Sequence, residues 1–215
     1  MVLPLASADP VKLFREDWAE TPAALPITQE HVASAALQLN LYGGAVHGLK
    51  KSHHPEIEND PHYVWSGEID SVQWGATLSF HDGTSFDLSG DAYLTWRTRQ
   101  SGEGHCMRIL LRAVGGQWYV SEAVDCPTDE WQVTTHVFSE LEWGLLHGDS
   151  FAFADAEPTE SPDLSAIVEV GFTDLKAGES SPQSCRMDWI EVWGAYRPPL
   201  CKMVALTGGN FVCRY

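Results

Sequence analysis

Asp87-Leu88-Ser89-Gly90 leads directly into Tyr93-Leu94-Thr95-Trp96-Arg97, a turn-forming segment followed by an alternating stretch. The same order recurs where Asp163-Leu164-Ser165-Ala166 precedes Ile167-Val168-Glu169-Val170. Aspartate and serine hydrogen-bond to nearby backbone and favour turns, whereas β-branched and aromatic residues suit a pleated, half-buried surface. Each segment is therefore predicted to be a turn that enters a strand.

Further strand patterns lie on both sides of these segments. An entry strand is expected around Leu13-Phe14, and others at 76–80, 92–99, 106–114, 118–124, 131–138, 167–172 and 186–193. Gly, Asp, Pro and Ser clusters separate them, and no convincing amphipathic helix is present. The pattern predicts an all-β fold, an antiparallel β-sandwich (jelly roll) in a single domain. We expect residues 1–9 to be a flexible N-terminal segment, residues 10–194 the sandwich and residues 195–215 a C-terminal tail.

Composition fits one globular domain with an acidic surface. The 215 residues are 44% hydrophobic and include nine tryptophans, enough for a large core and a surface with aromatic rings. Thirteen Lys and Arg against thirty Asp and Glu give a formal charge of −17, which repels nucleic acid and anionic membranes. No apolar stretch approaches the roughly 20 residues of a spanning helix. Neither nucleic acid nor a membrane is an expected partner.

The N-terminus and the cysteines bear on the compartment. Ala6-Ser7-Ala8 fits the small-x-small pattern of a signal-peptide cleavage site, which predicts a secreted or periplasmic protein, although short Ala/Ser tracts are common. The five cysteines contain no C-x-x-C pair, so a zinc site is not indicated. Cys106 with Cys126, or Cys201 with Cys213, would bridge in an oxidising compartment. Buried free thiols are the favoured alternative.

Strand parity gathers basic residues on one side of two strands. Successive side chains point to opposite sides of a sheet. Leu94, Trp96 and Thr98 share one side of their strand, and the following strand has an apolar side of its own. The opposite sides carry four of the thirteen basic residues, namely Arg97, Arg99, Arg108 and Arg112. Taking the two strands as neighbours, we expect one basic sheet face, with ion pairing to Glu103 and Glu122 as the alternative.

Four segments together resemble the galactose-binding-domain-like jelly rolls found among carbohydrate-binding modules. They are Leu13-Phe14-Arg15-Glu16-Asp17-Trp18, Asp87-Leu88-Ser89-Gly90, Glu130-Trp131-Gln132 and Met187-Asp188-Trp189-Ile190-Glu191-Val192. The resemblance covers about residues 13–194, and the long loop at 43–65 departs from the simplest modules. It implies a carbohydrate ligand and a structural calcium site formed by Glu16 or Asp17 with Asp188. Oxygen ligands suit calcium, whereas a turn cap is the alternative role for Asp188.

The loop at 43–65 contains the densest polar and aromatic cluster, at residues 50–55 and 60–65. Histidine and tyrosine can exchange protons, and Lys51 could neutralise a carboxylate. Set over an arginine-bearing face, His53, His54 or Tyr63 would remove the proton next to a uronate carboxylate that arginine holds. This chemistry is that of a β-eliminating lyase. A surface loop without such a role is the alternative.

Residues 68–73 read Glu68-Ile69-Asp70-Ser71-Val72-Gln73 and resemble the laminarinase-type glycosidase motif Glu-x-Asp-x-x-Glu. Glu68 and Asp70 would face the same side of a strand, as paired carboxylates for glycoside hydrolysis require. The last acid of the motif is Gln73 here, and an amide cannot donate a proton as a carboxylic acid does. An ordinary polar strand edge is the alternative.

The leading hypothesis is carbohydrate binding on an arginine-bearing sheet face, with the loop at 43–65 closing one side. Trp65 is the expected stacking surface, while Trp96, Trp131 and Trp189 are interpreted as packing residues. The expected ligand-binding residues are Lys51, Trp65, Arg97, Arg99, Arg108, Arg112, Glu122 and His136. One alternative is a polysaccharide-cleaving enzyme, a lyase or a glycoside hydrolase, on the same scaffold. A structural or protein-interaction sandwich without a small ligand is the other.

Overall fold

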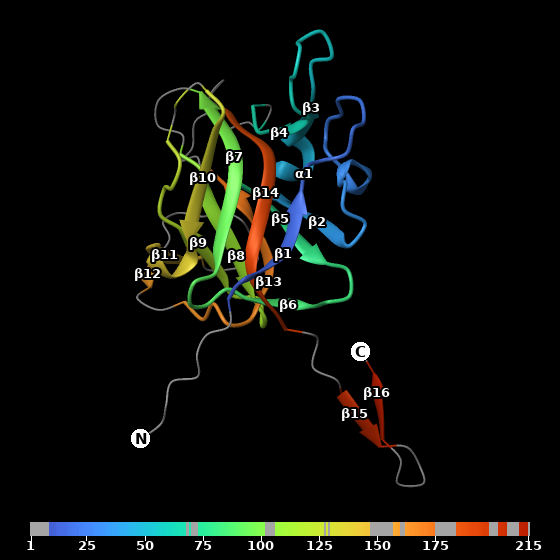
Figure 1. The fold of residues 1–215 in the computed structure, drawn as a ribbon, viewed down its shortest axis with the longest axis vertical. Coiled ribbons are helices and arrows are strands. Elements are labelled where there is room, and N and C mark those ends of the chain that lie inside the picture. The colour runs from blue at the N-terminus through green and yellow to red at the C-terminus, as the bar shows by residue number, and fades with distance from the viewer. Residues whose placement is uncertain are drawn as a thin grey trace.

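The computed structural model describes residues 9–67, 69, 73–101, 106–126, 128, 130–146, 157–159, 162–174, 184–197, 202–205 and 211–214. These residues form an antiparallel β-sandwich, as the sequence predicts (Figure 1). One layer, the front sheet, has the order β10-β7-β14-β1, and β4 and β3 extend it beside β14. Its strands are β1 (Val11–Glu16), β3 (Lys50–Ser52), β4 (Tyr63–Trp65), β7 (Tyr93–Ser101), β10 (Gln132–Val137) and β14 (Ser184–Arg197).

The second layer, the back sheet, has the order β2-β5-β13-β8-β9-β11-β12. Its strands are β2 (Leu37–Gly43), β5 (Trp74–Phe80), β8 (Arg108–Ala113), β9 (Trp118–Ser121), β11 (Trp143–Leu146), β12 (Glu157–Thr159) and β13 (Ile167–Thr173). The short strand β6 (Ser85–Asp87) pairs with β13 of the back sheet and with the end of β14. It therefore ties the two layers together.

The helical elements are short. They comprise α1 (Ala45–Gly48) and two 3₁₀ turns, η1 (Gln29–His31) and η2 (Phe138–Glu140). No helix in the described ranges is long and apolar enough to cross a bilayer. Two further strands, β15 (Lys202–Ala205) and β16 (Phe211–Arg214), pair with each other as a separate hairpin.

The two Asp-Leu-Ser segments form matching turns that lie side by side. The Asp87 carboxylate accepts hydrogen bonds from the Ser89 amide (3.1 Å) and hydroxyl (2.5 Å). Asp163 accepts the same pair from Ser165 at 3.0 and 2.7 Å. The leucines between them are buried, and the amide of Leu88 donates to the carbonyl of Leu164. The repeated sequence thus closes one end of the sandwich, which confirms its predicted role in the turns.

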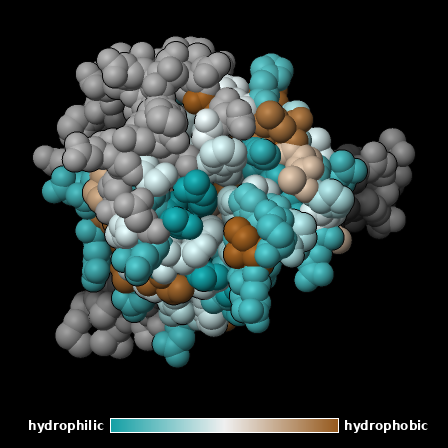
Figure 2. Space-filling view, turned by 90° about the horizontal axis from the view of Figure 1, so that it is seen from above, coloured by the Kyte–Doolittle hydropathy of each residue, from teal (hydrophilic) through white to brown (hydrophobic). Residues whose placement is uncertain are grey.

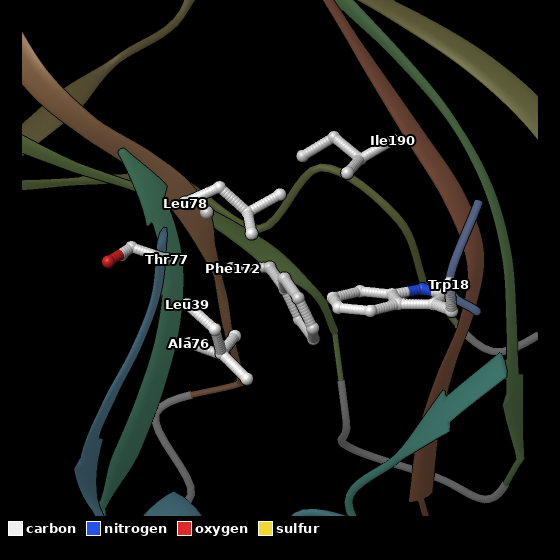
Figure 3. A pocket seen from close by; sticks show the side chains of 8 residues that line it. Trp18, Leu39, Ala76, Thr77, Leu78, Phe172 and Ile190 are labelled. Carbon is white, nitrogen blue, oxygen red and sulfur yellow. The ribbon is translucent and has the colours of Figure 1, made fainter. Parts of the chain in front are cut away.

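Alternation along the strands fills the space between the layers. In β7, Leu94, Trp96, Thr98 and Gln100 are buried and the residues between them are half exposed, as parity predicts. One large cluster of buried apolar residues includes side chains of both sheets. A pocket in this interior is lined by Trp18, Leu39, Ala76, Thr77, Leu78, Gly171, Phe172 and Ile190, and the Trp18 ring points toward Phe172 (Figure 3). Its lining contains no ionisable side chain, so it belongs to the core.

Three features of the fold differ from the sequence-based expectations. The expected loop at 43–65 contains α1, β3 and β4, which are too short to give a periodic pattern. Strand β14 continues to Arg197, past the expected strand end at residue 193, because its last residues pair with β6. Cys106 and Cys126 form a disulfide, which corrects the preference for free thiols, while Cys185 is a buried thiol. Cys201 lies outside the described residues.

Candidate functional site

The prediction that four arginines share one sheet face is wrong. Strand β7, with Arg97 and Arg99, lies in the front sheet between β10 and β14. Strand β8, with Arg108 and Arg112, lies in the back sheet between β13 and β9. Both pairs point away from the core, because the residues between them are buried. They consequently lie on opposite outer surfaces: strands consecutive in the sequence cross between the layers instead of pairing.

The outward side of the front sheet, here called the front face, combines aromatic rings with cations. Its members are Lys12, Arg15, Lys50, Trp65, Tyr93, Arg97, Arg99, Trp131, Arg186, Trp189 and Trp193. Tyr93 and Trp193 stack with their ring centroids 5.6 Å apart. A cation lies over each indole of the face at 4.1 to 5.6 Å from the ring centroid. Such contacts stabilise a cation and order the ring beneath it.

Arg97 lies at the centre of a cluster on this face. Its guanidinium donates to the Asp188 carboxylate at 2.6 Å and lies 5.2 Å from the ring centroid of Trp131. Burial raises the pKa of Asp188, and the hydrogen bond and charge of Arg97 oppose that rise. Asp188 is the extra residue where the register of β14 shifts between Met187 and Trp189. This bulge presents both a carboxylate and an indole on the front face.

Part of the loop at 43–65 lies beside this cluster. The ring of Tyr63 packs edge-on against Trp131, with centroids 5.5 Å apart. The Tyr63 hydroxyl is 3.3 Å from Nδ1 of His54, and that nitrogen is 3.1 Å from the Asp60 carboxylate. Tyr63 is only 4% exposed, whereas His54 is half-buried. The predicted neighbourhood of loop and Arg97 is present, with Tyr63 serving as packing between them.

Two further predicted site residues of this loop, His53 and Lys51, are less exposed than His54. His53 stacks on His62 with ring centroids 4.0 Å apart. Lys51 is fully buried, and its Nζ donates to the Thr21 carbonyl and lies 2.6 Å from Nδ1 of His62. Burial lowers the pKa of Lys51; burial and the nearby positive charge of Lys51 also lower that of His62. Lys51 therefore fixes the loop from its buried side. Contrary to the expectation from the sequence, it does not reach the front face.

On the back sheet, Arg112 belongs to a hydrogen-bond network around the buried Glu169. The Glu169 carboxylate accepts hydrogen bonds from Tyr42 (2.7 Å), Thr77 (2.5 Å) and Arg112 (2.9 Å). Arg112 also lies over the ring of Trp118, 5.2 Å from its centroid. Burial and the hydrogen bond to Glu169 raise the pKa of Tyr42. The network is a structural anchor of the outer side of the back sheet.

Three more predicted ligand-binding residues are distant from the front face. Arg108 donates to the Ser121 carbonyl at 3.0 Å on the back sheet, and Glu122 follows β9 there as an exposed residue. His136 points inward from β10, with Nε2 3.4 Å from the Asp125 carboxylate. His136 and Thr134 are two residues apart on β10 and therefore face the same side of the sheet, where Thr134 also contacts Asp125. The structure does not bring these residues together with Arg97.

The three expected calcium ligands are engaged by protein donors. Glu16 is fully buried and accepts the amides of Trp18, Ala33 and Ser34 at 2.7 to 3.0 Å; burial raises its pKa. Asp17 binds Arg15, and Asp188 binds Arg97. In the described part of the chain no three His, Cys, Asp or Glu side chains form a metal-binding group. Calcium binding stays a prediction for a metal titration to test.

Two indoles of the front face were interpreted from the sequence as packing residues. Trp131 and Trp189 are half exposed, whereas Trp96 is buried as expected. Along β14 the buried residues Ile190 and Val192 alternate with Trp189 and Trp193. Parity along this strand therefore indicates that Trp189 and Trp193 face outward. Glu68 and Asp70, the expected glycosidase pair, lie outside the described residues.

No family model and no curated protein matches this chain. Among solved structures, it is similar to the family 11 carbohydrate-binding module of the cellulosomal cellulase Lic26A-Cel5E of Clostridium thermocellum, with 17% identity, a TM-score of 0.45, and coverage of 82% of this chain and 97% of that one. The same family's module in complex with a β-1,3-1,4-mixed-linked tetrasaccharide gives 17% identity, a TM-score of 0.47, and coverage of 82% and 98%. An exo-β-agarase gives 11% identity, a TM-score of 0.44, and coverage of 78% of this chain and 24% of that one.

Proposed function

We propose that the chain binds a carbohydrate polymer across the front face of the sandwich. The observation that carries the proposal is the set of half-exposed indoles at Trp131, Trp189 and Trp193 on one sheet surface. The flat apolar side of a sugar ring packs on an aromatic ring. Trp189 and Trp193 lie four residues apart on β14, about 13 Å at the ordinary rise of a strand. A platform of this length suits a chain of sugars better than a single one.

Polar groups between the indoles support the same proposal. Thr95 and Thr135 share a hydrogen bond of 2.9 Å on neighbouring strands. Glu191 lies between the two indoles of β14 and accepts a hydrogen bond from Trp193 at 2.7 Å. Arg97 offers further N–H donors beside Trp131. Hydroxyls, carboxylates and guanidinium groups supply the donors and acceptors that sugar hydroxyls need.

The surface pattern agrees with a polar ligand. Seen from the end of the sandwich, the described apolar residues form small separate patches among hydrophilic ones (Figure 2). Large exposed hydrophobic residues are scattered over the chain, at Val11, Leu25, Val46, Ile57, Val114, Val133 and Tyr196. A broad apolar patch would favour a protein partner.

Affinity electrophoresis in gels that contain neutral or uronate-containing polysaccharides tests the proposal. We expect retardation of the native chain in at least one gel. Trp189→Ala should weaken that binding about tenfold or more, as truncation of a central aromatic anchor does. Arg97→Gln should weaken it as well, whereas Arg108→Gln, the matched change on the opposite surface, should leave it unaltered. Unchanged mobility of the native chain in every gel would refute the proposal.

The same incubations address the enzyme alternative. New reducing ends would reveal hydrolysis, and absorbance from an unsaturated product would reveal β-elimination. If cleavage occurs, His54→Ala and Glu68→Gln separate proton abstraction from glycosidase chemistry, because each removes the group that only one mechanism uses. We also propose export to an oxidising compartment, which the Cys106–Cys126 disulfide supports.

A further inference from the structure

Four outward side chains form one row across the front sheet. Lys50 of β3 pairs with Trp65 of β4, Trp65 with Arg186 of β14, and Arg186 with Arg99 of β7. The residues beside them in each strand, such as Lys51, Val64, Cys185 and Thr98, are buried, so the row itself points outward. Two cations, Lys50 and Arg186, thus flank a single indole, and Arg99 lies beyond Arg186. We call Lys50, Trp65, Arg99 and Arg186 the cationic row.

The cationic row differs from the rest of the front face in its charge balance. Lys12 is paired with Glu191, Arg15 with Asp17, and Arg97 with Asp188. Among the described residues no carboxylate pairs with Lys50, Arg99 or Arg186, and Arg186 has only a 3.4 Å hydrogen bond to the Ser101 hydroxyl. Three cations without a carboxylate partner in the described part of the chain thus stand together, in a protein of formal charge −17.

Hydrogen-bond donors also exceed acceptors at this place. Among the described residues, the buried indole N–H of Trp65 and the buried Nε–H of Arg99 have no hydrogen-bond partner. Buried donors normally have partners, and each exception calls for an explanation. A local excess of donors and positive charge is the chemical complement of an anion.

The indole at the centre of the row is positioned by its neighbours. Lys50 and Arg186 lie over the Trp65 ring, at 5.3 and 5.6 Å from the ring centroid. Gly67 lies so close that an added Cβ would come within 2.1 Å of the ring. The Trp65 ring therefore holds two cations at fixed places beside it.

From these observations we infer that the cationic row is a subsite for a carboxylate-bearing sugar, such as a uronate residue of an acidic polysaccharide. The inference rests on the proposed function and names its substrate class. Guanidinium groups bind carboxylates through paired hydrogen bonds, and an ammonium group adds a point charge. Because the remaining surface is acidic, an anionic polymer would be attracted here and repelled elsewhere.

The test compares polymers that differ only in charge. Binding of polygalacturonate and polymannuronate is measured by affinity electrophoresis beside the same polymers with methyl-esterified carboxyl groups. We expect tighter binding of the charged forms, and a preference that shrinks as salt screens the charges. Lys50→Gln and Arg186→Gln should each weaken binding of the charged form about tenfold, the loss expected for a charge-assisted hydrogen bond, and should leave the esterified form unaffected.

Lys12→Gln is the matched control, since Lys12 also lies over an indole, 5.4 Å from the centroid of Trp193, but is paired with Glu191. We expect less than a twofold effect from it. Equal binding of charged and esterified polymers would overturn the inference and leave the front-face proposal standing. Loss of binding in Arg186→Gln with none in Trp189→Ala would keep the subsite and refute the extended face. Stronger binding of dextran sulfate than of any polyuronate would contradict the carboxylate assignment and indicate a sulfate subsite. No binding to any polymer would refute both proposals.

Discussion

Replacing Asp125 should destabilise the sandwich, because one oxygen of its carboxylate accepts hydrogen bonds from residues of several strands. Oδ2 of Asp125 accepts hydrogen bonds from the Trp96 indole (2.6 Å), the Thr98 hydroxyl (3.0 Å) and the Thr134 hydroxyl (2.9 Å). The backbone of Asp125 bridges to Met107 as well. Strands β7 and β10 and the segment that follows β9 therefore meet at this group.

The magnitude follows from which donors lose their acceptor. In Asp125→Ala the Trp96 indole keeps the Thr134 oxygen at 2.9 Å as a second acceptor. The Thr98 hydroxyl, 2% exposed, keeps none that the structure shows. One unsatisfied buried donor and the loss of charge-assisted bonds give about 3 kcal/mol. For a chain of this length that amounts to a fall of about 6–12 °C in Tm.

The pH dependence has a definite sign. Burial raises the pKa of Asp125, but hydrogen bonds from His136 and Thr134 outweigh burial and hold it below its ordinary 3.8. A carboxyl group whose pKa is lowered on folding stabilises the folded state above its unfolded pKa, and this contribution fades as pH falls through the folded value. The difference in the free energy of unfolding between the native chain and Asp125→Ala, here called the gap, should thus have its full value at pH 7 and should shrink below pH 3.8.

Urea denaturation followed by tryptophan fluorescence at a series of pH values measures the gap. Asp163→Ala is the matched control, because Asp163 is a fully exposed aspartate whose hydrogen bonds to Ser165 also lower its pKa. We expect little change in stability from it. Coincident unfolding curves of Asp125→Ala and the native chain at pH 7 would refute the reasoning, as would a gap that stays constant down to the acid limit.

Three further substitutions have expected outcomes. Glu16→Gln turns an amide NH₂ toward backbone donors that the carboxylate now accepts, and should cost about 1–3 kcal/mol in the free energy of unfolding, measured by urea denaturation; an unchanged midpoint would contradict this. Gly171→Ala would place a Cβ within 1.9 Å of the Ala76 carbonyl oxygen and should displace a strand, which lowers the free energy of unfolding by about 1–3 kcal/mol or more; an unchanged Tm would contradict this. Cys106→Ser removes a disulfide that spans 20 residues and should cost about 2–4 kcal/mol, so equal thermal melts of the native chain with and without reductant would contradict it.

The strand pattern was readable from the sequence because it depends on local alternation. Leu94, Trp96 and Thr98 are buried where parity places them, and the two Asp-Leu-Ser turns form the expected hydrogen bonds. Strands of three residues such as β3 and β6 went unrecognised, since so short a segment does not complete an alternation.

The candidate site was less predictable because the local sequence does not specify which strands pair with one another. Parity placed Arg97 and Arg108 outward correctly, yet it cannot say that β7 and β8 belong to different layers. The row that joins Lys50 to Arg99 combines the neighbouring strands β3 and β4 with β7 and β14, which lie far from them in the sequence. Asp188 meets Arg97 on the front face because it stands in a bulge, and a bulge shifts the register of side chains in a way that alternation alone does not reveal.

Strand β14 belongs to both layers, pairing with β7 and then with β6 before it ends. Sheets joined only by loops can shear past one another, whereas here sliding would break the backbone hydrogen bonds of a continuous strand. Its amide protons should therefore exchange with deuterium only as fast as the whole domain opens. The indoles and cations that β14 carries keep their spacing without a ligand, so little ordering entropy opposes binding on that strand.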